Sequence, residues 1–230
     1  MNTPTQTPDA RPTIAVLGGT GHEGSGLAAR FALAGHPVLI GSCDAQRAAD
    51  KAAELNTLTG TTLLQGMGLD AAAAAASIVM LAVPFSAQQA TALALKAELE
   101  GKILIDVTVP LVPPKVSVVQ LPQGQSCVKQ LQDLLGTGVR VVSAFQNVGA
   151  HALVDPRAPV DCDVLVCADD AEARRTVAAL VNSIGMNAVE GGVLANSVVA
   201  EALTSLLIWV NRTYKVPAAG IRITGLPGQA

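Results

Sequence analysis

Short β-branched runs alternate with longer alanine-rich stretches along most of the chain. This alternation is typical of β-α-β units, in which helices cover both faces of a parallel sheet. Several of the runs are apolar at nearly every position, as expected of strands buried on both sides. We predict strands at residues 13–17, 37–40, 62–64, 78–83, 103–107 and 139–144, and helices at 25–34, 44–55, 70–76 and 86–99.

The same rhythm continues in the last third of the chain, with strands predicted at 163–167 and 187–190 and helices at 171–184 and 196–210. This part is too short for an independent domain. We therefore expect a flexible tail (1–12), a Rossmann-type domain (13–150) and a C-terminal extension (151–230) on the same sheet. The fold class is α/β, a doubly wound, mostly parallel sheet with a short C-terminal α/β extension.

The predicted helix at 196–210 is apolar on more than one face. We expect such a helix to be buried, here in the interface of a homodimer. Its apolar positions are Val198, Val199, Leu203, Leu206, Leu207 and Val210.

Composition narrows the classes of function. Of the 230 residues, half are hydrophobic but only 14% are charged, and the net charge is -3 without any block of Lys or Arg. This balance argues against disorder, nucleic-acid binding and an anionic membrane surface. The apolar stretch at 71–85 is too short to cross a bilayer, and residues 1–12 have no apolar targeting region, so we expect a cytoplasmic protein.

Cysteine and histidine spacing gives no sign of a metal site or disulfide framework. The four cysteines (Cys43, Cys127, Cys162 and Cys167) lack any CxxC spacing, and the three histidines are scattered. We expect free thiols and no bound metal.

The strongest local motif is a glycine-rich loop, GGTGHEG at residues 18–24, between the first predicted strand and the first helix. Gly19, Gly21 and Gly24 fill the G-x-G-x-x-G positions, which serve a tight turn, close approach of a pyrophosphate and helix–strand packing. The pyrophosphate would meet free N–H groups at the helix N-terminus. A turn that merely needs flexible residues is the simpler alternative, but the flanking strands and helix favour a dinucleotide site.

The end of the second predicted strand bears on which dinucleotide binds. An NAD site places a carboxylate there to bind the ribose 2′-OH, whereas this chain has Ser42, with Arg47 one helical turn further on. A hydroxyl and a cation favour the 2′-phosphate of NADP. Asp44 lies between them, and capping of the following helix is its expected role.

The chain lacks an obvious acid for reducing a carbonyl. Its one tyrosine, Tyr214, precedes Lys215 directly, so a Tyr-x-x-x-Lys pair is absent, and the predicted helix at 196–210 has no Lys. His151 is the one histidine placed near the predicted pocket, although a hydrogen-bonded structural role suits it better. Such a site suits direct hydride transfer between two flat heterocycles, because positioning does most of the work and water can supply the proton.

Taken together, the motifs resemble those of the NADPH-dependent reductases of the deazaflavin coenzyme F420. The resemblance spans residues 13–226. It is carried by VLGGTG (16–21), IGS (40–42), LAVPF (81–85), IDVTVPL (105–111), SAFQNV (143–148), DCDVLVCADD (161–170), YKV (214–216) and GIRITGL (220–226). The glycine loop is shared with many enzymes, but DCDVLVCADD (161–170) and the stretch from YKV (214–216) through GIRITGL (220–226) are particular to this family.

The resemblance implies an oxidoreductase that transfers a hydride between NADP(H) and coenzyme F420, as a homodimer. It implies that the coenzyme is contacted by the glycine loop, by the end of the second predicted strand and by a set of mostly apolar residues along the nicotinamide. It implies that the substrate is contacted by residues that follow the strands predicted at 103–107 and 139–144. The coenzyme contacts are Gly19, Thr20, Gly21, His22, Glu23, Gly24, Ser42, Cys43, Arg47, Val83, Pro84, Val109 and Ala150, and the substrate contacts are Pro110, Gln146 and Asn147.

Two departures from the family pattern leave alternatives open. Cys43 stands where members commonly have Arg, which weakens the expected preference for NADP. Gln146 stands where members commonly have His, so FMN or FAD could replace coenzyme F420 as hydride acceptor. A non-catalytic NADP-binding sensor is a third alternative, since such proteins share the glycine loop.

Overall fold

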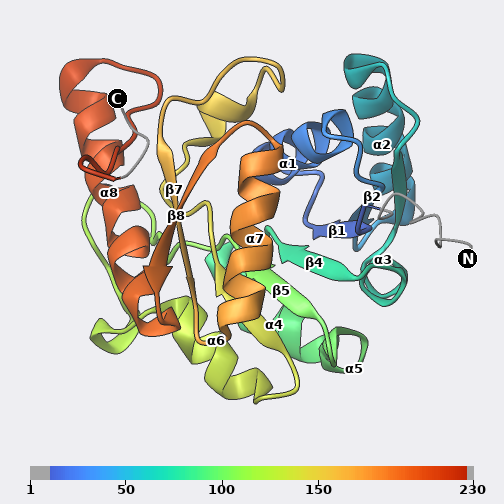
Figure 1. Ribbon diagram of the computed structural model, residues 1–230, viewed down its shortest axis with the longest axis horizontal. Helices are drawn as coiled ribbons and strands as arrows, with labels where there is room; N and C mark the ends of the chain where they lie inside the picture. The colour runs from blue at the N-terminus through green and yellow to red at the C-terminus, as the bar shows by residue number, and fades with distance from the viewer. Residues whose placement is uncertain (1–10, 227–230) are drawn as a thin grey trace, which may run out of the picture.

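The computed structural model describes residues 11–226, which form an eight-stranded sheet with helices on both faces (Figure 1). The strand order is β3-β2-β1-β4-β5-β6-β7-β8, and every neighbouring pair is parallel except β6 and β7. The predicted fold class is thereby confirmed. Most of the predicted tail lies outside the described residues. The strands are β1 (Ile14–Leu17), β2 (Val38–Ser42), β3 (Leu64–Gly68), β4 (Ile78–Leu81), β5 (Ile103–Asp106), β6 (Arg140–Ser143), β7 (Asp163–Ala168) and β8 (Asn187–Gly192).

The hydrophobic core consists of two layers, one on each face of the sheet. Strands β1, β4 and β5 are buried along their whole length, which explains why their sequences are continuously apolar. On one face the core includes α1 (His22–Leu33), α2 (Ala45–Thr59) and α7 (Ala171–Ser183), and on the other α3 (Leu69–Ala75), α4 (Gln88–Ala94), α5 (Lys96–Leu99) and α6 (Cys127–Leu135). Alanines dominate several of these helix faces and let the helices approach the sheet closely.

The last third of the chain continues the same sheet. Strand β7 pairs antiparallel with β6, and β8 pairs parallel with β7. The segment after α8 (Ser197–Tyr214) returns to the start of β7, where the Asp163 N–H donates to the Ile221 carbonyl oxygen at 2.8 Å and the Asp163 carboxylate accepts from the Ile223 N–H at 2.6 Å. The C-terminal run GIRITGL therefore fastens α8 and its loop to the sheet.

Several predicted boundaries were wrong, and one helix was missed. Strand β3 begins at Leu64 and includes glycines, which have weak strand propensity; pairing with β2 fixes them in place. The helix predicted at 86–99 is divided into α4 and α5 by Leu95, whose backbone is not helical. Helix α6 was not predicted, although Ser126 caps it by accepting from the Lys129 N–H at 2.9 Å.

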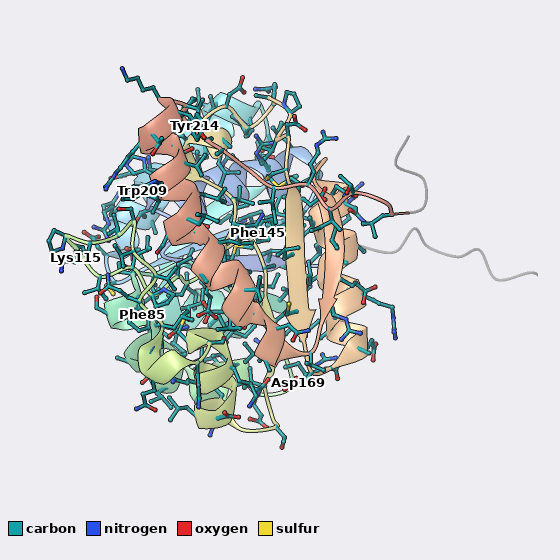
Figure 2. The ribbon with its side chains drawn as sticks, turned by 90° about the vertical axis from the view of Figure 1, so that its left-hand side faces the viewer. Phe85, Lys115, Phe145, Asp169, Trp209 and Tyr214 are labelled. Carbon is teal, nitrogen blue, oxygen red and sulfur yellow. The ribbon has the colours of Figure 1, made fainter. Side chains whose placement is uncertain are left out.

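Within a single chain, helix α8 keeps part of its apolar surface exposed, and its burial in a homodimer interface stays a prediction. Its buried positions are mostly small or polar, whereas Val199, Leu206 and Trp209 are each more than half exposed. Figure 2 shows Trp209 and Tyr214 along the outer part of the helix. Residues 194–214 are also long and apolar enough to cross a membrane by length and composition alone, with a mean hydropathy of 1.3.

The four cysteines are free thiols, as predicted. Cys43 is exposed, and the other three are buried.

Candidate active site

A cleft of about 540 Å³ opens at the carboxyl ends of β1 and β4, where the strand order reverses. Open α/β sheets place their ligands at this position, because the loops on either side diverge there. The cleft is lined by the loop before α1, the turn after β4, the segment after β5, the turn after β6 and one side of α8. Five segments that are distant in the sequence thus meet around one cavity.

The glycine loop forms the first wall of the cleft. A Cβ atom on Gly24 would lie 2.8 Å from the Gly18 carbonyl oxygen and 2.9 Å from the Gly19 Cα, so this position needs glycine for the helix to pack on the loop. A Cβ atom on Gly21 would meet only the Gly18 oxygen, at 3.4 Å, and the backbone of Gly21 is extended (φ -79°). The protein itself therefore leaves room at Gly21, consistent with close approach of a ligand. Gly21 is the N-cap residue of α1, and because it has no side chain, no side-chain hydrogen bond caps this helix. Backbone N–H groups at the N-terminus of α1 are therefore available to an anion.

The residues predicted to select NADP lie together at the end of β2. The Arg47 Nη2 donates to the Ser42 Oγ at 3.1 Å, and Asp44 caps α2 by accepting from the Arg47 N–H at 3.1 Å. The predicted capping role of Asp44 is confirmed. Cys43 is exposed beside them. The guanidinium and the hydroxyl thus lie side by side, and Arg47 forms no salt bridge with a carboxylate among residues 11–226.

The structure divides the predicted site residues into three groups. The first group lines the cleft and comes from the glycine loop, the segments after β4 and β5, and the turn after β6. Its members are Gly21, His22, Glu23, Gly24, Val83, Pro84, Val109, Gln146 and Ala150. Gly19, Thr20, Ser42, Cys43 and Arg47 lie outside this cavity, on the glycine loop or beyond the end of β2. Pro110 and Asn147 are buried and do not line it.

The Asn147 side chain is fully used by the protein itself. Its Nδ2 donates to the Asp163 carbonyl oxygen at 2.6 Å, and its Oδ1 accepts from the Leu165 N–H at 3.4 Å. The amide holds β7 against the turn after β6. Asn147 therefore supports the wall of the cleft, and its side chain is not available to a ligand.

Gln146 reaches the floor of the cleft because of an unusual backbone at the residue before it. Phe145 has φ +74°, a left-handed conformation that is rare for a bulky residue, and its side chain is fully buried (Figure 2). The Gln146 Nε2 then donates to the Asp106 carbonyl oxygen at 2.6 Å, and the Gln146 carbonyl oxygen accepts from the Thr204 hydroxyl on α8 at 2.6 Å. Burial of Phe145 holds the strained turn that aims Gln146 at the cleft.

Two buried polar atoms in the lining lack any partner among the described residues. They are the Gln146 Oε1 and the Thr108 Oγ1, on side chains that are 2% and 3% exposed. Buried polar atoms are nearly always hydrogen-bonded, so a ligand or an ordered water would complete this pair, as it would the three such atoms away from the cleft, Arg30 Nε, Gln88 Oε1 and Ser143 Oγ. An acceptor and a hydroxyl suit the amide or carbonyl groups at the edge of a flat heterocycle.

The floor of the site carries two carboxyl groups with raised pKa values. Burial raises the pKa of Asp106 to about 6, although hydrogen bonds from the Thr108 backbone N–H at 2.8 Å and the Gln88 Nε2 at 2.5 Å favour its charged form. Burial, reinforced by the nearby Asp106 charge, raises the pKa of Glu23 to about 8. Burial thus shifts both carboxyl groups toward their protonated forms.

The sequence prediction missed several residues of the cleft. Thr108 directly follows the predicted strand at 103–107 and lies within a motif already singled out, so its position at a strand end was a usable signal. Thr204, Ile208 and Asn211 come from α8, and no local pattern marks them. Only the tertiary fold brings that helix over the cleft.

Comparison with known proteins agrees with this geometry. Residues 13–110 match the family model described as NADP oxidoreductase, coenzyme F420-dependent. The F420-dependent NADP reductase of Methanothermobacter thermautotrophicus is 41% identical over 223 residues, which cover 94% of this chain and 96% of the relative. The chain belongs to the F420-dependent NADP reductase family. The predicted resemblance is confirmed.

Two further relatives support the family assignment. The F420-dependent NADP reductase of Methanocaldococcus jannaschii is 41% identical over 93% of this chain and 98% of its own. A solved structure from Arthrobacter sp. FB24, assigned as an F420-dependent NADP reductase, superposes with a TM-score of 0.78 at 28% identity, covering 93% of this chain and all of its own. Family membership thus spans the C-terminal extension as well as the glycine-loop half.

Among the described residues, no group of three His, Cys, Asp or Glu side chains is placed to hold a metal ion.

Proposed function

We propose that this protein is an NADP-dependent oxidoreductase that transfers a hydride between the nicotinamide of NADP(H) and the deazaflavin ring of coenzyme F420. The observation that carries the proposal is the cleft at the sheet's switch point, which joins a glycine loop to apolar walls and two unpartnered polar atoms. Identity of 41% over nearly the full length of a family member supports it.

The coenzyme would extend from the end of β2 into the cleft. Ser42 and Arg47 suit the 2′-phosphate, and the loop from Gly19 to Gly24 suits the pyrophosphate. The nicotinamide would lie along Val83, Pro84, Val109 and Ala150, which line the cavity. Two features of the glycine loop support these contacts: there is space beside Gly21, and no side chain caps the N-terminus of α1.

The protein's contribution to hydride transfer would be orientation and exclusion of water. When bound, NADPH supplies the hydride. Apolar side chains at Val83, Phe85 and Leu111 would keep the two rings in a dry slot, and Gln146 and Thr108, which line the same cavity, would offer hydrogen bonds to a ring edge. Positioning reacting rings in contact can account for most of the rate enhancement, without a covalent intermediate.

The reaction is tested by mixing the protein with NADPH and each acceptor under anaerobic conditions. We expect NADPH to bleach the visible absorbance of coenzyme F420, with slower turnover of FMN or FAD. Turnover of FMN or FAD without coenzyme F420 would identify a flavin reductase. Tight NADPH binding without turnover of any ring acceptor would identify a sensor protein and contradict the proposal.

We propose that the enzyme is a homodimer in the cytoplasm, with the exposed apolar side of α8 as its interface. Val199, Leu206 and Trp209 lie on that side at spacings of seven and three residues, which place them on one helix face. Buried Glu201 on the same helix accepts hydrogen bonds from the N-terminus of α6, so α8 is held in the fold rather than free to enter a bilayer.

The dimer is tested by light scattering of the wild type and of Trp209→Glu. We expect the wild type at twice the chain mass, and the variant shifted at least tenfold toward monomer, because a charge would enter an apolar interface. Val154→Glu, at an exposed apolar residue far along the chain from α8, is the matched control. A monomeric wild type, or a Trp209→Glu variant that dimerises normally, would rule out this interface.

A further inference from the structure

Arg30 is a buried arginine that none of the proposed contacts to the coenzyme uses. It lies in the last turn of α1, and its side chain is only 5% exposed. Among residues 11–226 it forms no salt bridge with a carboxylate, and its Nε has no hydrogen-bond partner. A buried charge is costly unless polar groups compensate it, so the groups around this guanidinium bear on its role.

The compensation comes from backbone carbonyl groups of a single loop. The Arg30 Nη2 donates to the Ala152 carbonyl oxygen at 3.2 Å. It also donates to the carbonyl oxygens of Asp155 and Ala158, each at 2.9 Å. These groups belong to the short helix η3 (Ala150–Leu153) and to the residues after it, between β6 and β7. Because the guanidinium is planar and always charged, it holds these three carbonyl groups in one arrangement beside α1.

The loop that Arg30 holds begins with one wall of the cleft. Gly149, Ala150 and His151 line the cavity and directly precede Ala152. The Ala152 N–H donates to the Gly149 carbonyl oxygen at 2.9 Å, which closes this turn on itself. Ala152 is therefore tied to the cleft wall by its N–H and to Arg30 by its carbonyl oxygen. A change at Arg30 reaches the wall through one turn of backbone.

The same turn packs directly on α1. A Cβ atom on Gly26 would lie 2.5 Å from the Cβ atom of Leu153, which is buried, so no larger residue fits between the helix and the turn. The first residues of α1 belong to the glycine loop, which forms the facing wall of the cleft. Both walls thus rest on α1, and the contacts of Gly26 and Arg30 set the separation between them.

We propose that Arg30 is a positioning residue for hydride transfer: by holding η3 against α1, it keeps the wall at Ala150 where the nicotinamide ring must rest to face the acceptor ring. This proposal rests on the proposed coenzyme site. Arg30 does not line the cleft and acts only through the loop. A displacement of about 1 Å can slow a reaction about 100-fold, whereas the phosphate contacts at the glycine loop are unchanged. Arg30 therefore affects the rate of transfer more than the affinity for NADPH.

The test is the single-turnover rate of coenzyme F420 reduction at saturating NADPH, for wild type, Arg30→Met and Arg30→Lys. We expect hydride transfer to be about 100-fold slower in Arg30→Met, with the dissociation constant of NADPH within about threefold of wild type. Arg30→Lys keeps the cation without the planar fork, so its rate should fall by only about tenfold. This variant also carries the test if Arg30→Met does not fold, as checked by thermal unfolding.

Arg157→Ala is the matched control, because Arg157 holds the same loop to a different helix. Its Nη1 donates to the Leu58 carbonyl oxygen at 3.0 Å, and its Nη2 donates to the Thr59 carbonyl oxygen at 2.9 Å, both at the end of α2. Its loss should lower the melting temperature but leave the rate of hydride transfer within about twofold of wild type. If Arg30 only stabilised the fold, both arginines would give this same pattern.

The possible results separate the two proposals. Wild-type rates in the Arg30 variants, an equal slowing by Arg157→Ala, or a loss of NADPH affinity as large as the loss of rate would overturn the role of Arg30. Each of these results would leave the proposed function in place. Failure of the wild type to reduce coenzyme F420 with NADPH would overturn the proposed function itself.

Discussion

Replacing Gly21 with alanine is expected to leave the fold intact and to weaken NADPH binding by about 10- to 100-fold. The added methyl group meets only the Gly18 oxygen at 3.4 Å, and the backbone conformation suits any residue. In the complex, however, the methyl group would separate the loop from the pyrophosphate. Loss of one hydrogen bond to a charged group costs about 1.5–3 kcal/mol, which corresponds to that range of affinity.

The matched control is Gly24→Ala in the same loop. Its methyl group would lie within 3 Å of two backbone atoms, so the loop or helix must shift and the melting temperature should fall. Thermal unfolding and NADPH titration of both variants separate the two effects. If Gly21→Ala binds NADPH as tightly as wild type, the pyrophosphate does not approach the loop as proposed.

Replacing Glu201 with alanine is expected to cost about 3 kcal/mol of folding free energy. The Glu201 carboxylate is 1% exposed and accepts from the Ser126 hydroxyl at 2.5 Å and from the Cys127 N–H at 2.9 Å, which begin α6. Without it, the Cys127 N–H would be buried and unpaired, and of these hydrogen bonds between α8 and the start of α6 only the one between the Ser126 and Ser197 hydroxyls would remain. Chemical denaturation gives the change directly.

Two comparisons check the cause of the Glu201 effect. Glu201→Gln keeps one acceptor and the same shape, so it should lose clearly less stability than Glu201→Ala. Glu98→Ala, at a partly exposed helical residue, should change stability by less than about 0.5 kcal/mol. Equal losses for alanine and glutamine at position 201 would show that the charge, rather than the hydrogen-bonded cap, is what stabilises the protein.

Most strands of the sheet were predicted from the sequence, because their apolar, β-branched composition distinguishes them from the neighbouring segments. Short, continuous apolar runs rich in β-branched residues, such as those of β1 and β4, are typical of buried strands, and the glycine loop between β1 and α1 marks the switch point. The prediction failed where tertiary contacts override local preference. Strand β3 contains Gly66 because α2 packs against it, where a Cβ atom would lie 2.1 Å from the Ala48 backbone.

The candidate site was predicted in its glycine loop and in the residues that follow strands, but not in the residues of α8. Val83, Val109 and Gln146 follow strands and were placed in the cleft from sequence. Asn147 was expected beside Gln146 but is turned away by the left-handed Phe145, which no sequence pattern indicates. The raised pKa of Glu23 could not be inferred from the sequence either. It depends on burial and on Asp106, which lies more than eighty positions away in the sequence.

Transfer of the hydride itself is most directly followed with NADPH deuterated at C4 of the nicotinamide, on the face that is transferred. In ordinary water, with coenzyme F420 as acceptor, the account predicts that the reduced deazaflavin carries the deuterium on its ring carbon. It also predicts that the visible absorbance is lost at the same rate at which labelled NADPH is consumed. Reduced coenzyme without the label, or NADPH bound in the cleft without any transfer to the deazaflavin, would contradict direct hydride transfer between the two rings.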